Sequence, residues 1–182
     1  MRKLLLSLAL AAAAAPLAAQ ASMAADPMPA SYKAVQLSAL KAQRRLLLAM
    51  ADSMPESHYR EHATPIQRTF GEQIMHAAGS AAMIAGGFAR GTRSMAPLPD
   101  STAAANTRAG LDKYINAAYD FAEATLAAQT PSERGATVNM FGNQMPGWKV
   151  WDEIHEHTFW TAGQVVANFR MNGMAPPGFG FF

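Results

Sequence analysis

Apolar residues recur at every third or fourth position in four segments of the chain, with polar and charged residues between them. The four stripes run over residues 37–54, 70–88, 107–128 and 146–173. Such spacing is typical of amphipathic helices, and each helix must bury its apolar face against a neighbour. We find no strand-like alternation and no internal repeat. The pattern therefore predicts an all-α protein whose helices pack as a four-helix bundle.

The predicted helices have recognisable ends. Pro55 stops the first helix, and Thr69 with Glu72 forms a T-x-x-E capping box at the start of the second. Pro146 suits the first turn of the fourth helix, and Gly173 suits its end. These residues fix where each helix is expected to begin and stop.

Two of the predicted connections are long. They span residues 92–106 and 129–145, which is enough for a crossover between parallel neighbouring helices. Thr130 and Glu133 form a second capping box, which predicts a short extra helical turn in the last connection.

The N-terminal segment has the pattern of a secretion signal. Arg2 and Lys3 precede a continuous apolar run over residues 4–18, and small residues follow with an A-x-A pattern ending at Ala21. A second candidate cut lies after Ala25. The apolar run is shorter than the roughly 20 residues that a membrane-spanning helix needs. We therefore expect an exported protein, periplasmic or secreted, that is soluble and not membrane-bound after the signal is removed.

Cleavage after Ala21 divides the chain into four parts. These are a signal peptide (1–21), a flexible lead (22–30), the bundle (31–177) and an apolar tail (178–182). The tail is expected to fold back on the bundle or to cover a partner subunit.

Charge and cysteine content exclude several functions. The chain has 15 Lys and Arg against 13 Asp and Glu, and loss of Arg2 and Lys3 leaves the mature protein neutral. Binding to nucleic acid or anionic lipid therefore has no electrostatic support. The chain has no cysteine, which excludes disulfides, a thiol nucleophile and thiolate metal ligands.

Two of the five histidines are placed to meet inside the bundle. His155 and His157 form a His-x-His pair, but on a helix they point roughly 200° apart and cannot easily share one ion. His76 lies two turns inside the second predicted helix. A metal held between helices needs inward-facing histidines from two of them, and His76 with His157 is the pair that offers this.

Several stretches together resemble the DinB-like (damage-inducible, YfiT-type) family. The matching stretches are Ala51 to Pro55, Thr69 to Ala78 with its histidine, and Gly163 to Pro177 with G-Q, "FRMNG" and a double proline. The resemblance covers residues 34–177. It implies an up-down-down-up four-helix bundle with long connecting loops, often a homodimer, with a divalent metal such as zinc or nickel held by three histidines.

The chain departs from the family's metal pattern at one position. The second-helix ligand falls on His76 and the first fourth-helix ligand on His157, but the last ligand position holds Thr161. A threonine hydroxyl is a poor ligand compared with an imidazole, so low metal occupancy is expected. In this scheme Gln164 and Asn168 would orient a small-molecule substrate.

Two functional hypotheses follow. In the first, the protein is a metal-dependent hydrolase or a thiol-dependent transferase, in which the ion activates water or an external thiol. In the second, it is a metal-free, non-enzymatic bundle that binds a small ligand or a partner. In that case His76 and His157 would be buried histidines hydrogen-bonded to each other or to Thr161 and Gln164. The tryptophans and phenylalanines of the fourth helix, Trp160 included, are expected in the core.

Overall fold

The computed structural model describes residues 29, 31–91, 93–94 and 96–178. The predicted signal peptide (1–21) and the last four residues of the predicted tail lie outside these residues. In chain order the elements are α1 (Ser31–Ser53), the short 3-10 helix η1 (Glu56–His58), α2 (Phe70–Phe88), α3 (Ser101–Ala104), α4 (Arg108–Ala128), α5 (Pro131–Gly135), β1 (Thr137–Met140), β2 (Asn143–Pro146) and α6 (Lys149–Met171).

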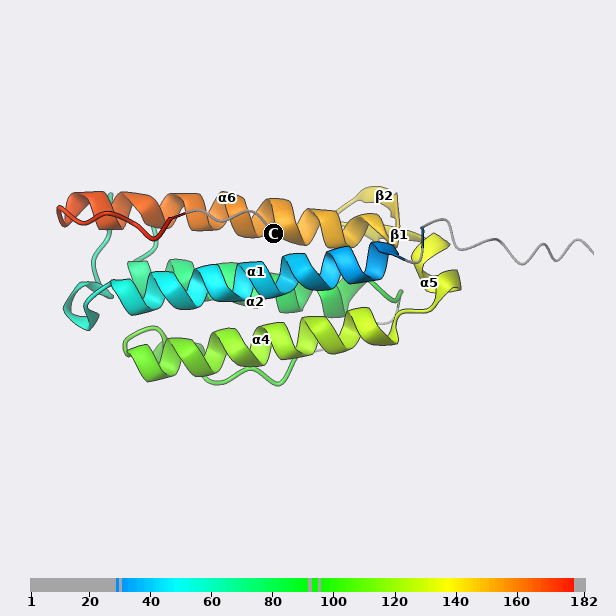
Figure 1. Ribbon diagram of the computed structural model, residues 1–182, viewed down its shortest axis with the longest axis horizontal. Helices are drawn as coiled ribbons and strands as arrows, with labels where there is room; N and C mark the ends of the chain where they lie inside the picture. The colour runs from blue at the N-terminus through cyan, green and yellow to red at the C-terminus, as the bar shows by residue number, and fades with distance from the viewer. Residues whose placement is uncertain (1–28, 30, 92, 95, 179–182) are drawn as a thin grey trace, which may run out of the picture.

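Four long helices, α1, α2, α4 and α6, lie side by side along the molecule (Figure 1). The Tyr32 hydroxyl donates to the Trp148 carbonyl at 2.6 Å, so α1 and α6 begin at the same end. At the other end, Arg108 at the start of α4 forms an ion pair with Asp52 at the end of α1. The prediction of a mainly helical fold is confirmed.

The core is formed by the apolar stripes of the four long helices. Leu47, Ile74, Ile115 and Ile154 are fully buried, one from each helix. Burial of such a side chain contributes about 1.5–3 kcal/mol, and a chain without cysteine has no disulfide to add to this contribution. The largest buried side chain is Trp151, whose indole N–H donates to Gln129 Oε1 at 2.9 Å.

One aromatic residue of α6 does not lie in the core. Trp160 is 75% exposed, so the expectation that it is buried is wrong. It lies nine residues after Trp151, and nine steps of about 100° place it on the opposite side of the helix. The expectation assigned the helical spacing of the other aromatic residues to Trp160 as well, although Trp160 does not lie on the same face of the helix as Trp151.

The predicted helix caps are present. Thr69 and Glu72 form a reciprocal capping box at the start of α2, and Thr130 and Glu133 form another at α5. Each box satisfies two backbone N–H groups that the first helical turn leaves free. α6 begins at Lys149, three residues after the predicted Pro146, because Pro146 ends a strand.

A two-stranded antiparallel hairpin, β1–β2, was not predicted. Val138 pairs with Met145 and Met140 with Asn143, and the connecting residues Phe141 and Gly142 both have positive φ, 51° and 92°. Positive φ at both central residues is what a tight hairpin turn requires. Only two alternating side chains, Val138 and Met140, are buried, which is too short a pattern to detect in the sequence.

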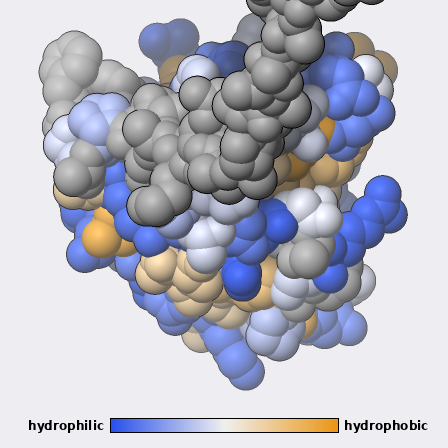
Figure 2. Space-filling model, turned by 90° about the vertical axis from the view of Figure 1, so that its right-hand side faces the viewer, coloured by the Kyte–Doolittle hydropathy of each residue, from blue (hydrophilic) through white to orange (hydrophobic). Residues whose placement is uncertain are grey.

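The surface is mixed. At the end that carries α5 and the hairpin, polar side chains surround smaller apolar areas (Figure 2). Among the described residues, no helix has the length and apolar character needed to cross a membrane. After α6 the chain turns back along the molecule (Figure 1), where Pro177 and Gly178 line a groove of about 340 Å³ with α1 and Phe159.

Candidate functional site

The structure brings His76 and His157 together where α2 packs against α6. Their ring centroids are 5.1 Å apart, with an angle of 70° between the ring planes. The alignment of the two helices is held by Gln164, whose side-chain oxygen accepts from Gln73 Nε2 at 3.1 Å. Its carbonyl accepts from Gln67 Nε2 at 3.0 Å. These bonds fix which turn of α6 faces His76.

The other three predicted site residues lie along α6 beyond His157. Thr161 is buried, one turn from His157. Gln164 is engaged by the two α2-side glutamines described above, and Asn168 Nδ2 donates to the Glu61 carbonyl at 3.1 Å. The side chains of Gln164 and Asn168 therefore tie α6 to α2 and to the segment before it. Their predicted role in orienting a substrate stays a prediction.

The second hypothesis expected His76 and His157 to be hydrogen-bonded to each other or to Thr161 and Gln164. The structure does not show these hydrogen bonds among the described residues. His157 Nδ1 is buried and has no hydrogen-bond partner among the described residues. A buried polar atom without a partner is uncommon, because it loses its hydration without compensation. Nδ1 of His157 is therefore a buried polar atom that the described residues leave unsatisfied.

Both imidazoles are shifted toward the neutral form. Burial lowers the pKa of His76, and the nearby positive charge of Arg68 lowers it further. The same two causes, burial first and then Arg68, lower the pKa of His157. At neutral pH each ring is therefore uncharged, with one nitrogen able to donate and one able to accept.

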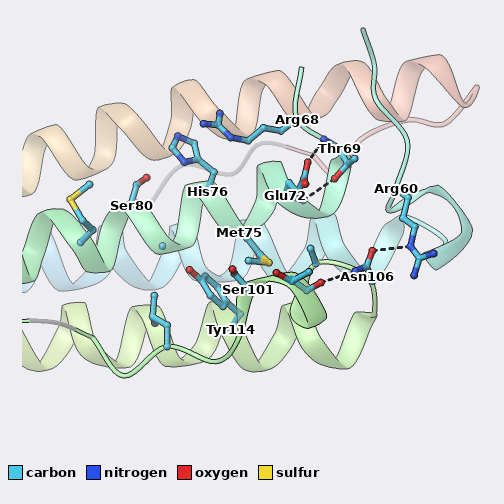
Figure 3. A pocket seen from close by; sticks show the side chains of 15 residues that line it. Arg60, Arg68, Thr69, Glu72, Met75, His76, Ser80, Ser101, Asn106 and Tyr114 are labelled. Carbon is cyan, nitrogen blue, oxygen red and sulfur yellow. Dashed lines mark hydrogen bonds between the residues drawn. The ribbon is translucent and has the colours of Figure 1, made fainter. Parts of the chain in front are cut away.

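A pocket of about 920 Å³ opens beside His76, between α2, α4 and the segment that contains α3. In Figure 3, His76 and Ser80 lie on the side of α2 toward α6, Tyr114 extends from α4 toward α2, and Arg68 extends toward His76. The lining residues are Arg60, Arg68, Thr69, Glu72, Met75, His76, Gly79, Ser80, Met83, Leu98, Ser101, Thr102, Ala105, Asn106 and Tyr114.

Gly79 makes room for one wall of this pocket. A Cβ atom at this position would lie 2.6 Å from the Tyr114 hydroxyl oxygen, which is closer than van der Waals contact allows. Because Gly79 has no side chain, the Tyr114 hydroxyl can lie against α2. Gly79 follows His76 by three residues, which is about one helical turn.

Three lining residues were not identified from the sequence as site residues: Arg68, Ser80 and Tyr114. Ser80 had a detectable signal, since it lies one turn after His76 on the same helical face. Arg68 precedes the helix cap and Tyr114 comes from a different helix, so only the tertiary structure places them beside His76.

The remaining histidines do not join the pair. His155 lies between α6 and α1, where its Nδ1 bonds with Gln43 Nε2 at 2.6 Å. His58 Nδ1 bonds with Glu61 at 2.9 Å, and His62 Nδ1 with the Gln67 carbonyl at 2.6 Å. Within the part of the chain that the structure describes, no group of three or more His, Asp or Glu side chains could hold a metal ion.

Comparison with known proteins identifies the fold. No protein-family profile and no curated protein matches the sequence. Among solved structures, a DinB-like protein from Bacillus cereus matches with a TM-score of 0.62 and 20% identity, over 79% of this chain and 95% of that one. A DinB-like protein from Bacillus subtilis matches with a TM-score of 0.63 and 17% identity, over 80% of this chain and 96% of that one. The resemblance noted in the sequence is confirmed for the fold.

Proposed function

We propose that this chain, which has the fold of DinB-like proteins, is a small-molecule-binding protein whose ligand occupies the pocket beside His76 without a metal ion. The observation that carries the proposal is the pocket itself, which is about 920 Å³ in volume and lined in part by polar side chains that have no hydrogen-bond partner among the described residues. Ligand sites are usually concave and mostly apolar, with a few convergent polar groups.

Two hydroxyl groups of the pocket lining are available to a ligand in this way. Ser80 is 6% exposed and Tyr114 8% exposed, and among the described residues neither hydroxyl has a hydrogen-bond partner. Burial raises the pKa of the Tyr114 phenol, so the group stays protonated and can donate. Buried hydroxyls normally find partners inside the protein. Two that face an open pocket without one are suited to bind a ligand.

The metal that the DinB-like resemblance implies has an incomplete donor set here. Catalytic zinc sites usually have three protein ligands and one open position. His76 and His157 supply two imidazoles, and the third position is the Thr161 hydroxyl, a weak neutral donor. The positive charge of Arg68 reaches both rings and further disfavours a cation. These residues do not fit a resident catalytic ion.

A weak two-histidine metal site is the second candidate. The 5.1 Å separation of the rings and the unpaired Nδ1 of His157 favour it, because both rings could turn a nitrogen toward one ion. A metal-dependent hydrolase would follow from such a site. A thiol-dependent transferase would need an external thiol, because the chain has no cysteine.

The finer features expected from the family complete the proposal. We propose an up-down-down-up bundle, which is supported by the shared ends of α1 with α6 and of α2 with α4. Export is supported by the N-terminal pattern over residues 1–21, and a homodimer by the family resemblance alone.

The test uses the neutral fluorescent probe N-phenylnaphthylamine. We expect saturable binding at one site per chain in metal-free protein, with substoichiometric zinc and nickel by elemental analysis. Because the chain has no cysteine, Met83→Cys gives a unique thiol at the pocket, and bound probe should slow its alkylation. Met171→Cys, exposed at the end of α6, is the control and should be unaffected. Absence of saturable binding, or stoichiometric metal lost in His76→Ala, would overturn the proposal.

A further inference from the structure

The geometry points to an organic anion with a compact apolar body as the ligand of this pocket, with Arg68 holding its negative group. This inference rests on the proposed function and specifies the ligand class for the same pocket. Three observations support it: the Arg68 side chain has no partner among the described residues, the pocket lining has an excess of positive charge, and the rest of the lining is largely apolar.

Arg68 is an uncommitted cation at the pocket wall. Within the part of the chain that the structure describes, its guanidinium forms neither a hydrogen bond nor an ion pair. Arg60, on the same wall, differs because its Nε donates to Asn106 Oδ1 at 2.8 Å. A guanidinium carries five N–H donors in a planar fork that suits an oxyanion, and Arg68 has all of them available.

The one carboxylate of the lining is already engaged. Glu72 accepts from the Thr69 backbone N–H at 3.0 Å as part of the capping box. That bond is the main reason why the pKa of Glu72 lies below its usual range, and Arg68 contributes only weakly. Glu72 therefore acts as the helix cap and leaves the Arg68 donors free.

The lining charges favour an anion. The pocket lining carries the two guanidinium groups of Arg60 and Arg68 and the single carboxylate of Glu72, while His76 is neutral. The N-terminal end of α2, a 19-residue helix, faces the same rim and adds to the positive potential. A cationic ligand would be repelled here, whereas an anionic one would gain a charge-assisted pair with the exposed guanidinium of Arg68.

The rest of the pocket suits an apolar body. Met75, Met83 and Leu98 contribute flexible or branched apolar side chains, and Tyr114 adds its ring. Methionine adapts to irregular shapes, which permits contact with flat or branched ligands alike. The ligand class is therefore an amphiphilic acid, such as an aromatic or branched carboxylate or another organic oxyacid.

The experiment compares two probes that differ by one negative group. N-phenylnaphthylamine is neutral, and anilinonaphthalene sulfonate has the same rings with a sulfonate added. We expect the sulfonate to bind wild-type protein about tenfold more tightly, because a charge-assisted pair at the edge of a pocket is a strong contact. Arg68→Gln should abolish this preference, so that the two probes bind the variant with equal affinity.

The control is Arg170→Gln, which removes the same charge from the exposed last turn of α6, outside the pocket lining. It should keep the full preference for the sulfonate. Raising the salt concentration should reduce the preference in wild type and have little effect in Arg68→Gln.

The outcomes separate this inference from the proposed function. If the neutral probe binds at the pocket but the sulfonate binds no more tightly, or Arg68→Gln keeps the preference, the anion inference is overturned and the small-molecule proposal stands. If neither probe binds saturably, the small-molecule proposal fails and the anion inference fails with it. Protection of Met83→Cys by both probes shows that each occupies the pocket.

Discussion

α6 carries two histidines, two residues apart, that differ in whether their ring nitrogens have hydrogen-bond partners. His155 faces α1, where Gln43 Nε2 lies 2.6 Å from its Nδ1 and Gln36 Oε1 bonds with its Nε2. Gln36 in turn donates to Asp152 at 3.0 Å. His157 faces α2, where it meets His76, and its buried Nδ1 has no partner within the part of the chain that the structure describes.

The difference between these two sides of α6 separates a structural histidine from a candidate ligand-binding one. On the α1 side the polar network is closed, because both ring nitrogens are used and a glutamine supplies each partner. On the α2 side, Nδ1 of His157 has no partner among the described residues, and the neighbouring His76 lines a pocket of about 920 Å³. A buried network in which every polar group has a partner stabilises the fold. A buried polar group without a partner would instead be stabilised by a ligand that supplies the missing hydrogen bond.

The largest expected effect comes from removing the closed network. His155→Ala should lower the free energy of unfolding by about 3 kcal/mol, because the buried Gln36 and Gln43 would each lose a hydrogen bond. His157→Ala is the matched variant on the other side and should cost less than about 1 kcal/mol, since no hydrogen bond is lost. Urea denaturation at pH 7 measures both. Equal losses would show that the two sides do not differ in this way.

The same network should make stability depend on pH. Burial lowers the pKa of His155 from 6.5 to about 4, so between these values the unfolded chain binds more protons than the folded one. Stability is therefore lost as the pH falls from 6.5 toward 4, by about 3 kcal/mol from this residue.

Urea denaturation of wild type and His155→Gln across this pH range isolates the effect. The variant should lack this part of the pH dependence, while acidic groups and the other histidines contribute equally to both proteins. An unchanged pH profile in His155→Gln would contradict the assignment.

A third imidazole should convert the open side into a metal site. Thr161→His places the missing histidine one turn after His157. Zinc affinity, measured by competition with a chromogenic chelator, should rise about tenfold or more over wild type. Thr161→Val keeps the size of the buried side chain and should leave zinc binding unchanged. No gain in a folded Thr161→His protein would mean that the α6 residues do not align with the family's ligand positions.

Two glycines of α2 provide the smallest and most local test. A side chain at Gly87 would meet nothing within 4 Å, whereas one at Gly79 would lie 2.6 Å from the Tyr114 hydroxyl oxygen. Gly87→Ala should raise stability by about 0.5–1 kcal/mol through helix propensity alone. Gly79→Ala should lose that gain and weaken binding of N-phenylnaphthylamine, because Tyr114 must move within the pocket. Equal affinity in the two variants would show that Tyr114 does not shape the ligand site.

Much of the fold could be predicted from the sequence because its signals are local. The helical periods, the capping boxes at Thr69 and Thr130 and the start of α4 depend on residues within one or two turns of each other. The hairpin was missed because its pattern holds only two buried side chains, Val138 and Met140, and its turn has Phe141 where glycine or asparagine is usual.

The candidate site was predictable only in part. Helical geometry separated His155 from His157, and the inward faces of two helices selected His76 as the partner of His157. The pocket was not predictable, because its wall combines Arg68 from a loop, Gly79 from α2 and Tyr114 from α4. Its size depends on how closely those helices approach, which no local pattern encodes.

By itself, the sequence determined which segments are helical, which two histidines share a junction between helices, and that the third position of the family's histidine pattern is a threonine. The tertiary structure alone decided that both ring nitrogens of His155 bond with glutamines. Among the described residues, Nδ1 of His157 has no partner, and its neighbour His76 lines a pocket together with Arg68. The physical reason is that helical period depends on neighbours in the chain, whereas hydrogen-bond satisfaction and cavity shape depend on side chains brought together from distant segments.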